Sequence, residues 1–356
     1  TARGRGPRGG AGRGGRSGRG GADATGGWLA GRPGGRPRGI LGRMGAVRVP
    51  ERQRSAREPA RRPPPIDESA WRRIVRDVRD ELRTREPFPP GPKDLDLRRT
   101  LQMVRDPLPI LLECYERYGP VFSTRIMHGV NVWALGPEAN HQILVSDARN
   151  FLWREGSFGD LIPLLGDGLL TIDGAYHRRV RRIMLPAFHR EQIAGAADTM
   201  VAEASAALDR WRPGETVDVY HWARNLAMRI AMRALLGLDP DDGDTGRRAA
   251  HEFERALSFY GTDFALRVLR GPGSPWSRLV AARAELDRIL YAEIRRRRAR
   301  GEVGEGDILG MLLAATDEDG STLTDEEVRD QAMTLMFAGH DTSTSTITFL
   351  LHELAH

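Results

Sequence analysis

The chain contains only one cysteine, Cys114, among 356 residues, and this scarcity excludes two structural classes. A disulfide-stabilised fold needs paired cysteines, and the common structural zinc sites need several. The sequence also lacks a run of about 18 apolar residues, which a membrane-spanning helix requires, and its N-terminus lacks the apolar core of a secretory signal. We therefore expect a soluble, cytoplasmic protein without a transmembrane anchor.

Lysine is almost absent: Lys93 is the only lysine, and arginine supplies the other permanently basic side chains. The net charge of +6 is unevenly distributed along the chain. Residues 1–65 contain sixteen arginines and three acidic residues, so this leader is strongly basic and the remaining chain is net acidic. The high isoelectric point therefore describes the leader and not the rest of the protein.

Residues 1–45 consist mainly of glycine and arginine and contain almost no side chains that could form a core. This composition predicts a disordered arm. Arginine–glycine arms can bind RNA through charge and guanidinium stacking, but they usually interleave aromatic residues, and Trp28 stands alone here. Binding of nucleic acid is therefore the less favoured interpretation, and translation of DNA upstream of the true start is the favoured one.

Proline-rich segments divide the chain into a leader at 1–65, a helical linker at 66–86 and a domain at 87–356. In the linker, apolar residues recur at helical spacing from Trp71 to Leu82, which predicts an amphipathic helix. Such a helix can lie on a membrane surface, but docking of its apolar stripe on the body of the protein is the commoner outcome.

The domain is expected to be mainly α-helical with a small β region. Apolar periodicity and turn signals predict helices at 109–118, 137–145, 190–211, 219–237, 246–260 and 276–299, and strands at 121–126 and 130–135. The last helix begins at Thr324, where Glu327 completes a capping box. Its apolar residues predict passage through a core; they are Leu335, Met336, Phe349, Leu350 and Leu351.

Midway along this last helix the sequence changes abruptly to Ala338-Gly339-His340-Asp341-Thr342. A glycine inside a helix costs roughly 1 kcal/mol relative to alanine, and a buried carboxylate must find a partner. One interpretation is a glycine kink, with nearby hydroxyls bonding back to the preceding turn. The other is a functional notch, in which small residues admit a bulky ligand and the acid and the hydroxyl transfer protons to it.

A second polar segment lies in another predicted helix and consists of His177-Arg178-Arg179-Val180-Arg181-Arg182. His177 and Arg181 are four residues apart, so they share one helix face and suit a pair of carboxylates. The alternative is an exposed, solvated basic helix. The other arginines of the run fall on different faces, where they could meet an acidic electron-transfer partner.

Together these segments resemble the cytochrome P-450 family of haem-thiolate monooxygenases over roughly residues 87–356. The family's oxygen-activation segment reads as a small residue, Gly, any residue, an acid and Thr. The resemblance implies that Ala338 and Gly339 form a groove for dioxygen. It also implies that Thr342 hydrogen-bonds the dioxygen and that Asp341 helps to relay protons to it.

The same resemblance implies that His177 and Arg181 hold the propionates of haem b. It implies a substrate pocket lined by Ala338 and by an apolar loop before that helix, whose candidate residues are Phe158, Leu161, Ile162 and Leu165. Buried packing is the alternative for this loop. The implied enzyme inserts one oxygen atom of O2 into an apolar small molecule, with electrons from a ferredoxin or a flavoprotein reductase.

Two parts of the family pattern are missing from the sequence. One is the Glu-x-x-Arg pair, and the other is the glycine-flanked cysteine loop whose thiolate ligates the iron. Cys114 lacks that flanking pattern, so we expect it to be a packing residue and we assign no metal ligand. The expectation is a partial P-450 fold, truncated before the cysteine loop and inactive as written.

The sequence also contains an H-E-x-x-H pattern, at His352-Glu353-Leu354-Ala355-His356. On a helix this pattern places two imidazoles on one face for zinc, with the glutamate as a general base. Nothing upstream resembles a metallopeptidase. A zinc metallopeptidase is therefore the alternative to the monooxygenase, and the RNA-binding arm at 1–45 is a third hypothesis.

Overall fold

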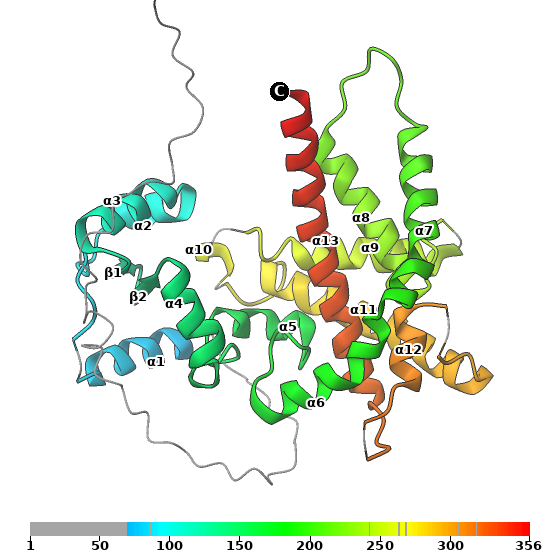
Figure 1. Ribbon diagram of the computed structural model, residues 1–356, viewed down its shortest axis with the longest axis horizontal. Helices are drawn as coiled ribbons and strands as arrows, with labels where there is room; N and C mark the ends of the chain where they lie inside the picture. The colour runs from blue at the N-terminus through cyan, green and yellow to red at the C-terminus, as the bar shows by residue number, and fades with distance from the viewer. Residues whose placement is uncertain are drawn as a thin grey trace, which may run out of the picture. The chain divides into compact units, whose positions relative to one another are not determined.

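The computed structural model describes residues 70–85, 87–241, 243–262, 264–267, 269–304, 306–317 and 319–356. The expectations for the leader, a disordered arm with an RNA-binding alternative, lie outside these residues. The described chain is mainly helical and contains one two-stranded sheet (Figure 1), which confirms the predicted fold class. None of the described helices is both long enough and apolar enough to cross a membrane.

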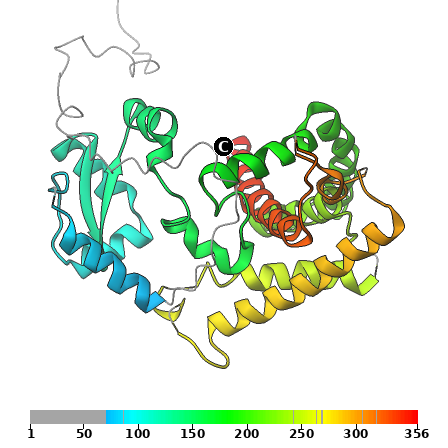
Figure 2. The ribbon, with the colours of Figure 1, turned by 90° about the horizontal axis from the view of Figure 1, so that it is seen from below.

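The sheet is a hairpin in which β1 (Val121–Ile126) pairs antiparallel with β2 (Gly129–Ala134). Helices α2 (Leu97–Arg105) and α3 (Leu108–Tyr118) precede the hairpin, and α4 (Pro137–His141) follows it (Figure 2). Cys114 is buried here in a small cluster with Met103, Ile110 and Phe122, so the expectation of a packing residue is confirmed. Helix α2 was not predicted, although Asp96 caps it by accepting hydrogen bonds from the first backbone amides.

Helix α1 (Ala70–Arg83) confirms the amphipathic helix predicted in the linker, but it docks through charged residues. Glu81 accepts hydrogen bonds from Arg125 of β1, and Asp77 lies 3.2 Å from Nε2 of His128 in the hairpin turn. Leu82 of the apolar stripe remains 82% exposed. The expectation that the stripe docks on the body is therefore wrong for Leu82, because α1 contacts the hairpin through Asp77 and Glu81, which lie to one side of the stripe.

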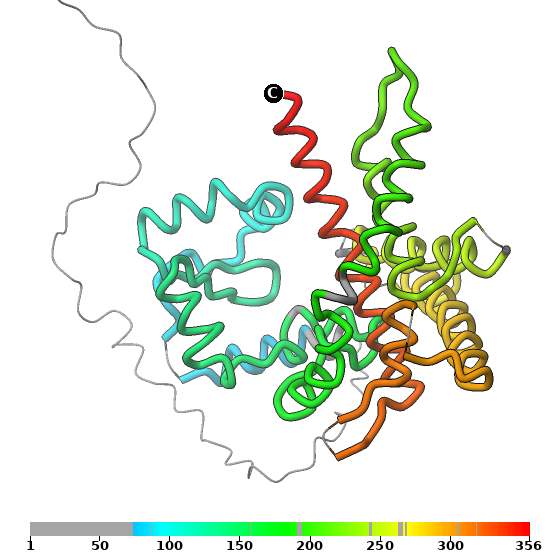
Figure 3. Tube along the Cα trace, turned by 45° about the vertical axis from the view of Figure 1, so that its right-hand side comes forward, coloured from blue at the N-terminus to red at the C-terminus, as the bar shows by residue number. Residues whose placement is uncertain are grey.

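The remaining helices pack around α13 (Asp325–Ala355), which contacts α8 (Val219–Leu236) most extensively and also touches α11 (Pro275–Arg300) (Figures 1 and 3). Helix α9 (Gly243–Leu257) runs along α11. The predicted helices agree with these bounds to within a few residues. The other helical elements are η1 (Gln142–Ser146), η2 (Ala148–Asn150), η3 (Ser157–Leu161), α5 (Ile162–Leu165), α6 (Gly174–Met184), η4 (Leu185–Phe188), α7 (Arg190–Leu208), α10 (Phe264–Arg267) and α12 (Ile308–Ala314).

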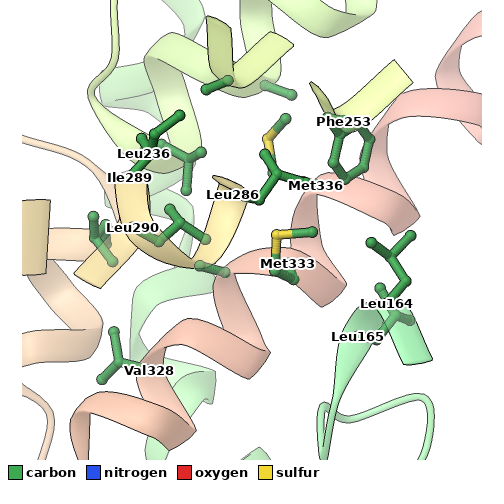
Figure 4. Packing of buried hydrophobic residues seen from close by; sticks show 14 of the residues in the cluster. Leu164, Leu165, Leu236, Phe253, Leu286, Ile289, Leu290, Val328, Met333 and Met336 are labelled. Atoms are coloured by element: carbon green, nitrogen blue, oxygen red, sulfur yellow. The ribbon is translucent and has the colours of Figure 1, made fainter. Parts of the chain in front are cut away.

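The main core lies between α13 and the helices that cover its first half. Figure 4 shows Met333 and Met336 of α13 beside Leu286 of α11, with Leu164 and Leu165 of α5 at the edge of the cluster. All of these side chains are less than 9% exposed. Burial of such apolar area supplies most of the favourable free energy of folding.

Helix α13 begins with the predicted capping box. Thr324 Oγ1 accepts a hydrogen bond from the backbone amide of Glu327 at 3.2 Å, and Glu327 Oε2 accepts one from the amide of Thr324 at 2.8 Å. Passage through the core is confirmed for Met336, but Phe349 and Leu350 are 69% and 56% exposed. The prediction is wrong for these two residues, because no described side chain covers the second half of the helix there.

We expect Thr324→Ala to lower the free energy of unfolding by about 1 kcal/mol, because the amide of Glu327 loses its acceptor. Urea unfolding followed by circular dichroism measures this loss. Thr346→Ala is the matched control, since the exposed Thr346 lies on the same helix and its hydroxyl only bonds back to the carbonyl of Thr342. Equal losses in the two variants would contradict a specific role for the cap.

Candidate functional site

The segment from Ala338 to Thr342 lies midway along α13, and its two sides have different environments. His340 and Thr344 are fully buried, whereas Ala338 and Thr342 are exposed. An α-helix has 3.6 residues per turn, so residues 338 and 342 share one side and residue 340 points away from it. The segment therefore has an open face and a packed face.

Free space adjoins the open face at Gly339, because a Cβ atom placed there would meet no atom within 4 Å. Thr342 Oγ1 donates a hydrogen bond to the carbonyl of Ala338 at 2.6 Å. The back-bonding expected from the kink interpretation is therefore present, but the helix continues through Gly339 without a break. A hydroxyl that donates in this way can still accept a hydrogen bond through its lone pairs.

Asp341 is held at the edge of the open face by an arginine from α8. Nη1 of Arg224 donates to Oδ1 of Asp341 at 2.6 Å, and Nη2 of the same side chain donates to Oε2 of Glu254 on α9 at 2.7 Å. Burial opposes the charge of Arg224, but Glu254 and Asp341 outweigh that effect and raise its pKa. The guanidinium therefore stays charged, and it helps to hold the pKa of Glu254 below its ordinary value.

His340 lies on the packed face between these two carboxylates. Its Nε2 is 3.1 Å from Oε1 of Glu254, and its Nδ1 is 3.2 Å from Oδ1 of Asp341. The ring meets Phe253 edge-on, with centroids 6.0 Å apart. Neither nitrogen is aligned for a hydrogen bond in this geometry, so these are close polar contacts of the buried ring.

The predicted propionate pair occupies one face of α6. His177 is half-buried and Arg181 is exposed. Burial and the charge of Arg181 lower the pKa of His177 below its ordinary value, so the two side chains lie within electrostatic reach of each other. Within the described part of the chain, Arg181 forms no ion pair. These two side chains are thus available to hold an anionic ligand.

Helix α6 is attached to the first turn of α13 by other residues. The hydroxyl of Tyr176 donates to Oε1 of Glu327 at 2.8 Å, and Nη1 of Arg179 donates to the same oxygen at 3.0 Å. Arg179 also lies 3.5 Å from the carboxylate of Asp317. The expectation that Arg179 meets an external acidic partner is therefore wrong, because carboxylates of the same chain already pair with it. Arg178 remains exposed; Arg182 is exposed as well, but its Nη1 lies 3.8 Å from Oδ1 of Asp317.

The loop before α6 is also bonded to α13. Oδ2 of Asp330 accepts from the amide of Asp167 at 2.9 Å, and Oε1 of Gln331 accepts from the amide of Leu169 at 3.0 Å. The intervening Gly168 approaches α13 so closely that a Cβ atom would lie 1.7 Å from Oγ1 of Thr334. Two separate sets of hydrogen bonds therefore attach α6 and the loop before it to the first half of α13.

The predicted pocket loop is partly exposed and partly core. Phe158, Leu161 and Ile162 are half-buried, and Phe158 packs edge-on against Trp153 with centroids 5.3 Å apart. Leu165 is fully buried in the main core (Figure 4), so the packing alternative describes its environment. Phe158, Leu161 and Ile162 stay predictions as pocket residues, together with Ala338.

The H-E-x-x-H pattern lies at the exposed end of α13. The rings of His352 and His356 are 4.4 Å apart, and Nδ1 of His356 lies 2.9 Å from the carbonyl of His352. In the regions that the structure describes, no three His, Cys, Asp or Glu side chains are grouped to hold a metal ion. The geometry therefore gives the zinc hypothesis no support.

Three members of the site were not predicted from the sequence: Arg224, Glu254 and His340. His340 occupies the position of the motif where any residue is allowed, so the pattern itself carried no signal. Arg224 precedes Asp341 by 117 residues and lies on a helix with no motif of its own. Charged residues on the buried faces of the predicted helices are the signal that could have identified these three side chains.

A family model described as cytochrome P450 matches residues 89–356. Putative cytochrome P450 135B1 of Mycobacterium tuberculosis is 33% identical over 274 residues, which cover 75% of this chain and 57% of that protein. Putative cytochrome P450 135A1 of the same organism is 30% identical over 281 residues, which cover 76% of this chain and 61% of that protein. The chain thus spans 57% and 61% of the length of these relatives.

Solved structures are similar as well. The crystal structure of the cytochrome P450DA heme domain matches with a TM-score of 0.63 and 26% identity, over 76% of this chain and 60% of that one. Retinoic acid bound cyanobacterial CYP120A1 matches with a TM-score of 0.61 and 25% identity, over 73% and 58%. On these matches, the chain belongs to the cytochrome P450 family, whose members are haem b monooxygenases.

Proposed function

We propose that the described helices form the oxygen side and the propionate clamp of a monooxygenase that inserts one oxygen atom of O2 into an apolar small molecule. The observation that carries this proposal is the open face of α13, where Ala338 and Thr342 border free space at Gly339. Haem b, when bound, supplies the activation of dioxygen and the redox chemistry. The protein supplies position, protons and an apolar wall.

The donors on α6 fit the carboxylate side of haem. His177 and Arg181 share one face, and Arg181 forms no ion pair among the described residues, so both are available to two propionates. The only cysteine does not fit as the thiolate ligand. Cys114 is buried in the cluster beside the hairpin, and burial raises the pKa of its thiol, which favours the neutral form. We therefore propose that this polypeptide alone does not turn over.

The residues around the open face would divide the remaining work. Thr342 would place its hydroxyl beside the notch, and Asp341 would pass protons toward it from the solvent side. Phe158, Leu161 and Ile162 would exclude water and select a substrate by shape and apolar contact, since they carry no polar group that could orient one. A ferredoxin or flavoprotein reductase would dock near Arg178, which remains exposed.

Titration of the chain with haem, followed by absorbance, tests the clamp. We expect His177→Ala and Arg181→Ala each to weaken binding by roughly tenfold or more, because a hydrogen bond to a charged group contributes about 1.5–3 kcal/mol. Arg178→Ala is the matched control, since its exposed side chain lies on another face of α6. Reduction under carbon monoxide should give no thiolate-type absorption band.

Two results would overturn this proposal. One is an affinity for haem that is unchanged in the double variant His177→Ala/Arg181→Ala, which would remove the clamp. The other is a thiolate-type band from the wild-type chain, which would show that Cys114 ligates the iron. The titration reports binding without turnover, so it can be read even if the chain has no activity.

A further inference from the structure

Helix α1 leaves an apolar stripe largely exposed. This stripe, called the α1 stripe below, consists of Ile74, Val75, Val78 and Leu82, which share one side because an α-helix has 3.6 residues per turn. Val75 is 51% exposed and Leu82 is 82% exposed. The helix precedes residues 89–356, which match the family model, so the family match does not account for the stripe.

Arginines border the α1 stripe on its outer side. The exposed side chains of Arg79 and Arg83 line the same surface hollow as the apolar residues of the stripe. Within the described part of the chain, neither arginine forms an ion pair. Because a guanidinium group keeps its charge at neutral pH, positive charge stands beside the exposed apolar side chains.

The acidic residues of α1 face elsewhere. Asp77 lies 3.2 Å from Nε2 of His128 in the hairpin turn. Glu81 accepts hydrogen bonds from Arg125 of β1. Asp80, the remaining acid of the helix, is exposed and points away from the α1 stripe. These contacts fix the rotation of the helix, so that the side carrying both the stripe and the arginines stays free.

We infer that α1 binds the surface of an anionic lipid membrane. The α1 stripe enters the boundary between headgroups and acyl chains, and Arg79 and Arg83 meet the lipid phosphates. A helix that lies in the membrane interface needs this combination of apolar and basic residues on adjoining faces. The preceding residues 1–65 contain sixteen arginines and three acids, and basic segments beside such a helix strengthen binding to anionic lipid.

A second copy of the chain is the other occupant that an exposed apolar stripe can have. Pairing of two α1 stripes would bring the free guanidinium groups of Arg79 and Arg83 from both copies close together. It would also bring together two leaders that each carry a strong positive charge. Repulsion of like charges opposes this pairing, whereas an anionic membrane neutralises the same groups. Charge complementarity therefore favours the membrane.

Sedimentation of the full chain with lipid vesicles tests the inference. We expect binding to phosphatidylglycerol vesicles and much weaker binding to phosphatidylcholine vesicles, which carry no net charge. Leu82→Ser should weaken binding to phosphatidylglycerol by roughly tenfold, because an apolar side chain no longer enters the membrane. Arg79→Ala and Arg83→Ala should each weaken it by about fivefold, the effect of one basic residue near an anionic surface.

Two exposed residues on other helices are matched controls. Leu354 lies near the end of α13 and is 74% exposed, so Leu354→Ser removes a similar side chain outside the α1 stripe. Arg295 of α11 is exposed and forms no ion pair among the described residues, so Arg295→Ala removes a similar charge. Both controls should bind the vesicles as the wild type does. Losses in the controls that equal those in the α1 variants would overturn the inference.

The basic leader can bring the chain to an anionic vesicle by charge alone, so insertion of α1 is measured separately. A nitroxide label is attached to Val75→Cys on the α1 stripe, or to Asp80→Cys on the other side of the helix. The native Cys114 is buried and takes no label. On phosphatidylglycerol vesicles, electron paramagnetic resonance should show position 75 shielded from a water-soluble nickel reagent and accessible to O2. Position 80 should stay accessible to the nickel reagent.

Two outcomes of the labelling overturn the inference. If both labels remain accessible to the nickel reagent on the vesicles, the chain is held there by the charge of the leader and α1 does not insert. If, in addition, sedimentation velocity without lipid shows a dimer that Leu82→Ser dissociates, the α1 stripe belongs to a second copy. None of these measurements needs haem, so failure of the haem titration leaves this inference standing, and its own failure leaves the proposed function unchanged.

Discussion

Replacement of Arg329 by alanine should cost about 3–5 kcal/mol of unfolding free energy, the loss typical of a buried ion pair that loses one partner. The Arg329 side chain is 1% exposed within the first half of α13. Its Nη1 donates to Asp330 at 2.6 Å and its Nε donates to Asp287 of α11 at 2.5 Å. Alanine would leave the carboxylate of Asp330, itself 2% exposed, buried without this cation.

Urea unfolding at neutral pH, followed by circular dichroism, measures this loss. Arg288→Ala is the control, since Arg288 lies on α11 and pairs only on the surface with Glu285, where solvent screens the interaction. The control should unfold at the same urea concentration as the wild type. A similar shift in both variants would show that arginine side-chain packing, and not burial of the pair, determines the effect.

Gly166→Ala should lower the free energy of unfolding by about 3 kcal/mol, through two effects at one position. Gly166 has φ +67, a left-handed conformation that costs a residue with a Cβ atom roughly 1–2 kcal/mol. Its added methyl group would also lie 2.2 Å from Oδ1 of Asp330, and overpacking of this kind costs about 1–3 kcal/mol. The carboxylate must then leave the amide of Asp167 that it binds.

Gly174→Ala separates the two effects. Gly174 has φ +66, but a Cβ atom there would meet nothing within 4 Å, so only the conformational cost of roughly 1–2 kcal/mol remains. Thermal or urea unfolding of both variants gives the difference. Equal losses would mean that loop 166–169 and α13 can move apart to accommodate the added methyl group at little cost in unfolding free energy. A larger loss in Gly166→Ala should be accompanied by weaker haem binding, since the loop positions α6.

Local signals explain what the sequence predicted correctly. The capping box at Thr324 and Glu327, the apolar periodicity of the long helices and the alternation of the hairpin are all encoded within a few residues of one another. Helix α2 was not predicted because it is short and follows a proline-rich segment. Its one clear signal, the cap at Asp96, was overlooked. The exposure of Phe349 and Leu350 was not predicted, because periodicity shows which residues are apolar but not which side chains cover them.

The site shows the same division. Spacing placed His177 and Arg181 on one face and put Asp341 beside Thr342, and the structure retains both relations. Arg224 and Glu254 come from other helices, so no local pattern connects them to the motif. Arg179 shows the opposite error. A run of arginines predicts an exposed surface, but the fold places Glu327 and Asp317 beside Arg179, and both pair with it.

Glu327 combines three roles in one carboxylate: it caps α13, accepts from Tyr176 and pairs with Arg179. Burial works against its charge, but the bonds from Thr324, Tyr176 and Arg179 together lower its pKa below the ordinary value. The stability from these bonds is therefore complete above the ordinary glutamate range and is lost as the pH falls through the lowered pKa. Acid should consequently weaken the cap of α13 and the attachment of α6 to its first turn together, because one carboxylate serves both.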